Sequence, residues 1–177
     1  MASHRPLQTP RLTILPADAA RLEALLSSPG AFTLTTGFTV ADGFCPFEGA
    51  LIASLKAMHR AFDRHRPWWT PRLLVLNSAS EVIGLVKFKG PPDDGIVELG
   101  YAIAPAYQNR GFATEALDAV AGHAIRFSDV RLIRAHTKPG PSASARVLEK
   151  CSFQKVSEFL DSVEGLVWRW ERSALSP

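Results

Sequence analysis

The segment from residue 96 to residue 124 constrains the fold most, because a strand-like run, a short loop and an apolar helix follow one another there. The run 96–104 ends at Pro105, and a helix with an apolar stripe begins near Gly111. The first turn of a helix carries unpaired N–H groups and a partial positive charge. The loop before it is therefore predicted to bind an anion, above all a phosphate. An ordinary strand–loop–helix joint is the alternative, because Pro and Gly also punctuate turns.

The residues of this loop suit a phosphate. Gly111 and Ala113 are small enough for phosphate oxygens to approach the backbone, while Arg110, Gln108 and Asn109 add hydrogen-bond donors. Two better-known phosphate loops are excluded, since the chain has neither Gly-x-x-x-x-Gly-Lys-Ser/Thr nor Gly-x-Gly-x-x-Gly after a strand. Walker-type nucleotide hydrolysis and Rossmann dinucleotide binding are therefore disfavoured.

Residues 108–113, Gln-Asn-Arg-Gly-Phe-Ala, resemble the Gln/Arg-x-x-Gly-x-Gly/Ala signature of the GNAT acyltransferases. The flanking segments 98–101, Glu-Leu-Gly-Tyr, and 113–116, Ala-Thr-Glu-Ala, are similar to the ribosomal-protein N-acetyltransferase (Rim-type) branch of that family. Residues 7–15 resemble the opening strand of this branch, and residues 143–153 resemble its last helix and the start of the next strand. The resemblance covers residues 7–172.

The resemblance implies acetyl-coenzyme A (acetyl-CoA) as cofactor and direct acetyl transfer to a primary amine, either a protein N-terminus or a small molecule. It places the pyrophosphate on the backbone N–H groups of the loop 108–113 and the pantetheine arm along the strand that ends at Ile103. The cofactor-binding residues expected on this basis are Ala102, Ile103, Gln108, Asn109, Arg110, Gly111, Phe112, Ala113, Thr114 and Ser144.

Three positions depart from the family pattern. Pro141 stands where relatives place an Asn before the last helix, so that Ser142 or Ser144 would have to replace the amide. Leu148 stands where many GNAT enzymes carry a tyrosine general acid, and Ser152 stands where Gly is usual. These departures leave an alternative open: a GNAT domain that binds acyl-CoA without turnover, as a sensor or interaction module.

Glu98 is the candidate general base. Strand alternation puts Glu98 on one face with Gly100 and Ala102, which leaves open space for substrate and water. An alkyl amine titrates near 10, so a base must take its proton at neutral pH, and Glu98 would act through water. Backbone N–H groups near Ile103 would stabilise the oxyanion. The alternative is a salt-bridged strand carboxylate; His136 lies on the strand facing the cofactor groove but is not counted as a site residue.

Length and composition indicate one folded domain, and the resemblance places it over residues 7–172, with flexible tails at 1–6 and 173–177. Hydrophobic residues make up 46% of the 177-residue chain and charged residues 21%, which is close to globular averages. The net charge of +3 is too small and too scattered to predict specific nucleic-acid binding. The cluster from Lys56 to Arg66 is interpreted as a solvated helix face, with nonspecific RNA contact as the alternative.

Cofactor chemistry other than acetyl transfer is not indicated. Cys45 and Cys151 have no metal-type spacing, so neither a metal site nor a disulfide framework is expected.

The longest uncharged stretch, 24–41, is interrupted by Pro and Gly, so that no membrane span is expected and a cytoplasmic location is the default. A homodimer through exposed strands is possible.

Hydrophobic periodicity predicts an α/β (α+β) fold with about seven strands in a mixed sheet and helices on both faces. The resemblance to GNAT enzymes implies that this sheet is twisted and mostly antiparallel. Residues 28–46 are expected to form a long loop or a broken helix. The predicted strands are 7–15, 72–76, 82–88, 96–104, 131–137, 153–159 and 166–170, and the predicted helices are 18–27, 47–62, 111–124 and 142–150.

Overall fold

A mixed sheet of nine strands forms the centre of the computed structural model, which describes residues 5–44, 48–162 and 165–174. The strand order is β1-β2-β4-β5-β6-β7-β9-β8, and β3 pairs with β5 beside this path. The strands are β1 Leu7–Gln8, β2 Leu12–Pro16, β3 Thr39–Val40, β4 Arg72–Leu76, β5 Glu81–Phe88, β6 Ile96–Ile103, β7 Leu132–Thr137, β8 Gln154–Asp161 and β9 Gly165–Ser173.

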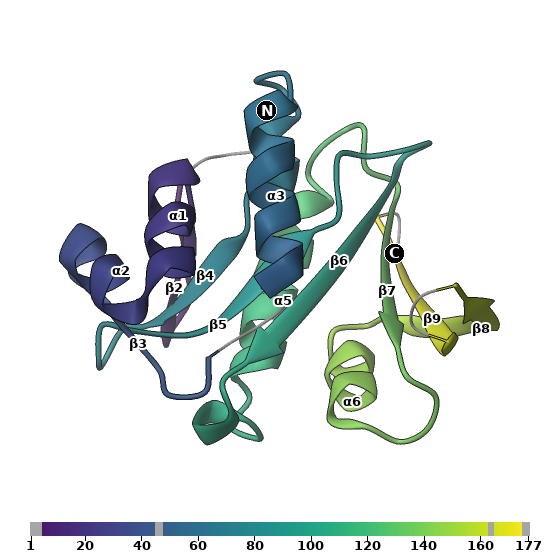
Figure 1. Cartoon of the computed structure of the whole chain (residues 1–177). Helices are drawn as coiled ribbons and strands as arrows, with labels where there is room; N and C mark the ends of the chain where they lie inside the picture. The colour runs from purple at the N-terminus through teal and green to yellow at the C-terminus, as the bar shows by residue number, and fades with distance from the viewer. Residues whose placement is uncertain (1–4, 45–47, 163–164, 175–177) are drawn as a thin grey trace.

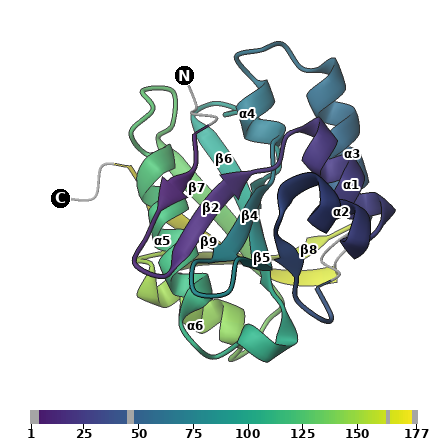
Figure 2. The ribbon, with the colours of Figure 1, turned by 90° about the vertical axis from the view of Figure 1, so that its left-hand side faces the viewer.

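Helices cover both faces of the sheet, as Figures 1 and 2 show. On one face, the first three helices bury Leu22, Phe32 and Leu51 against β4 and β5. On the other face, α5 buries a stripe of small and branched residues that includes Ala116, Leu117 and Val120. The helices are α1 Ala19–Ser27, α2 Pro29–Thr36, α3 Glu48–Arg60, α4 Arg66–Trp69, α5 Phe112–Ala124 and α6 Ala143–Lys150.

The predicted fold class is confirmed, and the differences are local. The opening strand is split into β1 and β2, because the chain turns at Thr9, whose backbone N–H donates to the Leu12 carbonyl at 2.9 Å. Within the segment predicted as a loop or broken helix, α2 begins at Pro29, with the Ser28 side chain as its N-cap, and β3 follows. Both additions are short.

The second helix was predicted too long. It ends at Arg60, and Phe62, which the periodicity placed on its apolar stripe, is 76% exposed.

The caps predicted for the first and last helices are confirmed: Asp18 accepts from Arg21 N at 3.0 Å, and Ser142 accepts from Ala145 N at 3.0 Å. Residues 1–4 and 175–177 of the predicted tails, together with Cys45 and Phe47, lie outside the described part of the chain.

The sheet is open between β6 and β7. These strands run parallel and pair only from Ile96 to Glu98, opposite residues 132–134. From Leu99 to Ile103, β6 pairs with β5 on its other side. Figure 1 shows β6 and β7 diverging beyond the paired part, with α6 near the open end. Backbone groups of β6 that would otherwise bond β7 therefore face a gap. The oxyanion site expected from the sequence near Ile103 requires such unpaired N–H groups.

Helix α6 ends in a Schellman motif with an unusual residue. The N–H of Phe153 donates to the Leu148 carbonyl at 3.0 Å, and the N–H of Ser152 donates to the Glu149 carbonyl at 3.1 Å. This motif requires a left-handed residue, and Ser152 has φ +61°. Glycine adopts that conformation without strain. The motif therefore forms here in spite of the missing glycine, because Leu148 and Phe153 pack together in the core.

Replacing Ser152 by Gly should stabilise the protein. Relief of left-handed strain outweighs the greater freedom of glycine in the unfolded chain, for a net gain of about 0.5–1 kcal/mol. Chemical denaturation would measure the free energy of unfolding, with Ser152→Ala as the control. The alanine variant keeps a Cβ and should gain nothing. Equal stabilities of the Gly and Ala variants would contradict this explanation.

Candidate active site

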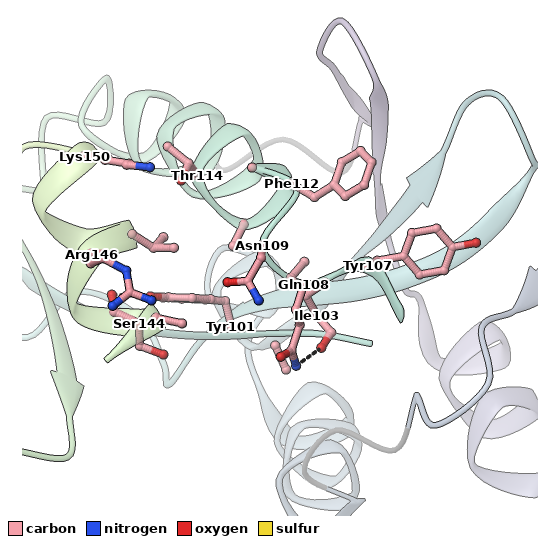
Figure 3. A pocket seen from close by; sticks show the side chains of 15 residues that line it. Tyr101, Ile103, Tyr107, Gln108, Asn109, Phe112, Thr114, Ser144, Arg146 and Lys150 are labelled. Atoms are coloured by element: carbon pink, nitrogen blue, oxygen red, sulfur yellow. Dashed lines mark hydrogen bonds between the residues drawn. The ribbon is translucent and has the colours of Figure 1, made fainter. Parts of the chain in front are cut away.

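A first cavity of about 330 Å³ lies between the end of β6, the loop before α5, and α6 (Figure 3). Except for Arg110, all of the predicted cofactor-binding residues line it. Arg110 instead lies over the rings of Tyr107 and Phe112, with its guanidinium carbon 5.4 and 5.3 Å from the ring centroids. The lining residues from the predicted set are Ala102, Ile103, Gln108, Asn109, Gly111, Phe112, Ala113, Thr114 and Ser144.

The loop before α5 has the backbone shape of an anion-binding nest. Asn109 and Gly111 both take left-handed conformations, with φ +58° and +80°, and Gly111 is the N-cap of α5. Turns of this kind point N–H groups into one concavity, and the helix dipole adds positive potential there. The Gln108 side chain is used differently from the prediction, since its Nε2 donates to the Ile103 carbonyl at 3.0 Å and ties the loop to β6 (Figure 3).

Two cations on α6 face this cavity and were missed in the sequence. Arg146 and Lys150 both line the pocket, opposite the loop (Figure 3). A spacing of four residues places two side chains on the same helix face. This spacing could have identified the pair once the helix was known to cover the cofactor groove.

The segment before β2 braces the loop. Glu115 on α5 accepts hydrogen bonds from Thr9 Oγ1 at 2.6 Å, from Arg11 N at 2.8 Å and from Arg11 Nε at 2.6 Å. Arg11 Nη1 also donates to the Arg110 carbonyl at 2.9 Å. Burial alone would raise the pKa of Glu115, but the hydrogen bonds from Thr9 and Arg11 outweigh it, and the net effect is a lowered pKa.

A second cavity, of about 660 Å³, lies between α3, α4 and the strands β5, β6 and β7. Tyr101 and Ser144 line both cavities, which places the two against each other where β6 leaves β7. Tyr101 Oη donates to the Ser144 carbonyl at 3.0 Å. Burial raises the pKa of Tyr101 and outweighs the opposing effect of this hydrogen bond, so the phenol is a neutral donor.

Glu98 lies beside the second cavity in a charged group. Its Oε1 is 2.9 Å from His136 Nδ1 and forms an ion pair with Lys89 Nζ. The ion-paired strand carboxylate considered from the sequence is therefore present, while a catalytic role for Glu98 stays a prediction. The open space expected nearby is also present, because no atom beyond the adjacent residues lies within 4 Å of where a Cβ on Gly100 would stand.

His136 lies closer to the second cavity than Glu98 does. It lines the cavity wall, and its Nε2 is buried without a hydrogen-bond partner among the described residues. Its other nitrogen contacts Glu98, as in carboxylate–histidine pairs that fix an imidazole's orientation. The two residues meet through the register of the parallel strands, which aligns Glu98 with Arg134 and brings His136 to the same face.

Neither Leu148 nor Cys151 supplies a reactive group to the two cavities. Leu148 is fully buried, so α6 offers no phenol at that position. Cys151 is buried and lines neither cavity, and burial raises the pKa of its thiol to about 11. Such a thiol is a poor acyl carrier. Within the described ranges, no cluster of His, Cys, Asp and Glu could hold a metal ion, and no helix is long and apolar enough to cross a membrane.

Residues 11–154 match the family model described as an acetyltransferase (GNAT) domain. The chain belongs to the GNAT family. A search of curated protein sequences found no match. GNAT enzymes use acetyl-CoA, and the resemblance stated from the loop signature is confirmed. Since the match covers most of the chain, the fold is that of the family.

Solved structures with this fold include Rim-type enzymes. RimL, a ribosomal L7/L12 α-N-protein acetyltransferase in complex with CoA, has a TM-score of 0.69 and 14% identity, covering 96% of this chain and 98% of its own. A ribosomal-protein-S5-alanine acetyltransferase from Vibrio fischeri has a TM-score of 0.68 and 12% identity, covering 98% and 100%. A spermidine N-acetyltransferase SpeG chimera from Vibrio cholerae and hSSAT has a TM-score of 0.65 and 15% identity, covering 93% and 96%.

Replacing Gly111 by Val should weaken CoA binding at least tenfold. The valine would be strained at φ +80°, and its Cβ would stand 3.3 Å from Arg11 Nη2, at the mouth of the nest. Isothermal titration calorimetry with CoA measures the affinity. Gly122→Ala is the control, because this glycine lies in α5 with open space around it and away from the cavity. Unchanged affinity in Gly111→Val would place the pyrophosphate elsewhere.

Replacing Glu115 by Gln should lower the free energy of unfolding at pH 7 by about 1–2 kcal/mol, because charge-assisted hydrogen bonds to Thr9 and Arg11 weaken. A carboxylate whose pKa is lowered on folding contributes stability above its unfolded pKa and loses it as the pH falls through the folded value. The difference from wild type should therefore shrink below pH 4.5, the ordinary pKa of the group. The exposed Glu149→Gln is the control. If the difference in unfolding free energy between Glu115→Gln and wild type did not change with pH, the explanation through the lowered pKa of Glu115 would be contradicted.

Proposed function

We propose that this protein is an N-acetyltransferase that moves an acetyl group from acetyl-CoA to a primary amine by direct transfer. The observation that carries the proposal is the pair of cavities that share Tyr101 and Ser144 at the split between β6 and β7. One cavity has the nest and cations suited to CoA. The other gives an amine access to the same point from the opposite side of β6.

The cofactor would lie in the first cavity. The backbone of residues 108–113 would hold the pyrophosphate, and Arg146 and Lys150 would attract the remaining phosphate charge from α6. Bound acetyl-CoA supplies a thioester, whose carbonyl carbon forms the new C–N bond while the C–S bond breaks and the thiolate takes up a proton. The thiolate is a good leaving group because thiols titrate near 8.5.

His136 and Glu98 together form the proposed base. His136 Nε2, free of any described partner and on the cavity wall, would accept the amine proton directly or through water. Glu98 would fix the ring through Nδ1 and stabilise the imidazolium that forms, and Lys89 would hold Glu98 in place. Glu98, the base predicted from the sequence, would thus act through His136.

The oxyanion would be stabilised by β6 itself. The Glu98 carbonyl accepts from Lys89 N, just after β5, and Ala104 N donates to Ile83 in β5. Alternation therefore turns the backbone N–H groups of Tyr101 and Ile103 toward the gap left by β7. An N–H group in that gap is preorganised for the developing charge. Tyr101, as a neutral phenol at the junction of the cavities, would keep Ser144 and the start of α6 in place.

The finer features of the proposal are the acceptor and the location. RimL is described as acting on the N-terminus of ribosomal L7/L12 and SpeG on spermidine, so that both macromolecular and small amines occur among structural neighbours. A primary amine is common to both. A cytoplasmic location agrees with the use of acetyl-CoA and stays a prediction.

Purified protein should release CoA thiol from acetyl-CoA only when an amine acceptor is present. A thiol-trapping assay against a mixed panel of small amines and peptide N-termini would measure this, with mass spectrometry of the acetylated product. Tight CoA binding without acceptor-dependent release across the panel would contradict the proposal and support the sensor alternative.

His136→Gln and Glu98→Gln should each lower kcat by about 100-fold or more, because each removes part of the proposed base. The pH profile separates the roles: in wild type the rate should rise with the deprotonation of one group, and this limb should be lost in His136→Gln. The control is His59→Gln, because His59 lies on the outer part of α3, away from both cavities. Wild-type kcat in His136→Gln would exclude the histidine as base.

A further inference from the structure

The second cavity is lined by positively charged and neutral residues. Lys87, Lys89, Lys138 and His136 contribute to its wall, and no Asp or Glu is among the described residues that line it. We propose, as an extension of the proposed function, that the acceptor is a primary amine that also carries a carboxylate. The amine would lie at His136 and the carboxylate among the cations.

Lys87 provides the first argument. It lies on β5 opposite Gly100, and its Nζ donates to the Ala50 carbonyl at 3.1 Å and to Ser54 Oγ at 2.8 Å. Both acceptors belong to α3 and are neutral. Burial, and then the charge of Lys89, lower the pKa of Lys87, which shows that the charge is held at a cost. A carboxylate in the cavity would offset this cost.

The neighbouring carboxylates are already engaged. Glu98 is bonded to both Lys89 and His136. Glu171, on the same sheet face, pairs with Arg134 at 2.7 Å. Neither carboxylate bonds Lys87, whose acceptors come from α3. Among the described residues, the Lys87 amine therefore has no acidic partner at the place where an acceptor would enter.

Arg169 does not line the cavity, but it adds positive charge next to His136. It lies directly opposite His136 in the β7–β9 register, so that the two side chains share a face of the sheet. Its guanidinium carbon lies 4.6 Å from the Phe159 ring centroid, and its Nε is buried without a hydrogen-bond partner in the described part of the chain. The positive charge of Arg169 raises the electrostatic potential around His136 and so favours an anion in the cavity beside it.

The same charges disfavour a polyamine. Apart from the reacting nitrogen, spermidine-like acceptors carry further ammonium groups, which Lys87 and Lys89 would repel. Two sources could supply an amine with a carboxylate: a free amino acid, or a peptide N-terminus with an acidic residue beside it. Both present the same chemistry to the cavity, and matched acceptors distinguish them.

The test compares kcat/KM within matched pairs of acceptors. The pairs are β-alanine against its amide, 4-aminobutyrate against its amide, and the C-terminally amidated peptides Ala-Asp-Ala against Ala-Asn-Ala, with 1,4-diaminobutane as the cationic amine. The carboxylate member should be preferred by about tenfold or more, which is the scale of one hydrogen bond to a charged group. Preference among the small pairs indicates a free amino acid, and preference in the peptide pair indicates a protein N-terminus. Equal or better turnover of the amides or the diamine overturns the inference.

Variants locate the effect. Lys87→Met should reduce the preference for the carboxylate member severalfold or more, and Lys87→Glu should abolish or invert it. Lys56→Met is the matched control, since it removes the same charge from an exposed position on α3 away from the cavity. Preference retained in both Lys87 variants would contradict the assignment, and thermal unfolding shows whether each variant is folded.

Failure of this inference differs from failure of the proposed function. If amides or diamines are acetylated best, acetyl transfer stands and the anionic acceptor is excluded. If no amine increases thiol release, acetyl transfer itself fails. Calorimetry of the same acceptor pairs against CoA-saturated protein then decides the inference independently: tenfold tighter binding of the carboxylate member supports it, and equal binding overturns it.

Discussion

The early end of the pairing between β6 and β7 is the constraint on which the rest of the structure depends. Three residues of each strand pair, and then β6 continues with β5 alone. A sheet that stayed closed would satisfy its backbone groups internally and leave no room for a thioester. Because it opens, β6 has a free edge beyond its pairing with β7, and two cavities meet there at Tyr101 and Ser144. Binding and chemistry are proposed at the same opening.

The elements around the opening are fixed by interactions outside it. Glu115 ties α5 to Thr9 and Arg11, which holds the nest against the first strands. The Schellman motif and its packed pair, Leu148 and Phe153, hold the end of α6. These contacts lie away from the reacting atoms, and they fix the positions of the loop and helix on which preorganised hydrogen-bond donors depend.

The charges divide the site into two parts with different tasks. On the CoA side, Arg146 and Lys150 face a backbone nest, which suits phosphate. On the acceptor side, the carboxylate of Glu98 is already bonded to Lys89 and His136, so that the remaining positive charge is directed at whatever enters. Charge distribution therefore bears on acceptor choice, whereas the fold, which is shared with enzymes of different acceptors, does not.

The sequence by itself determined the family, the loop and most elements, because these depend on local patterns: alternation in strands, a helix stripe, caps at Asp18 and Ser142, and the motif at residues 108–113. Only the tertiary structure joined Glu98 to His136, since they lie 38 positions apart and meet through strand register. The cationic acceptor wall has the same origin. Its members come from β5, β7 and the residues just after each of them, and no local pattern in one chain records which side chains will face a common cavity.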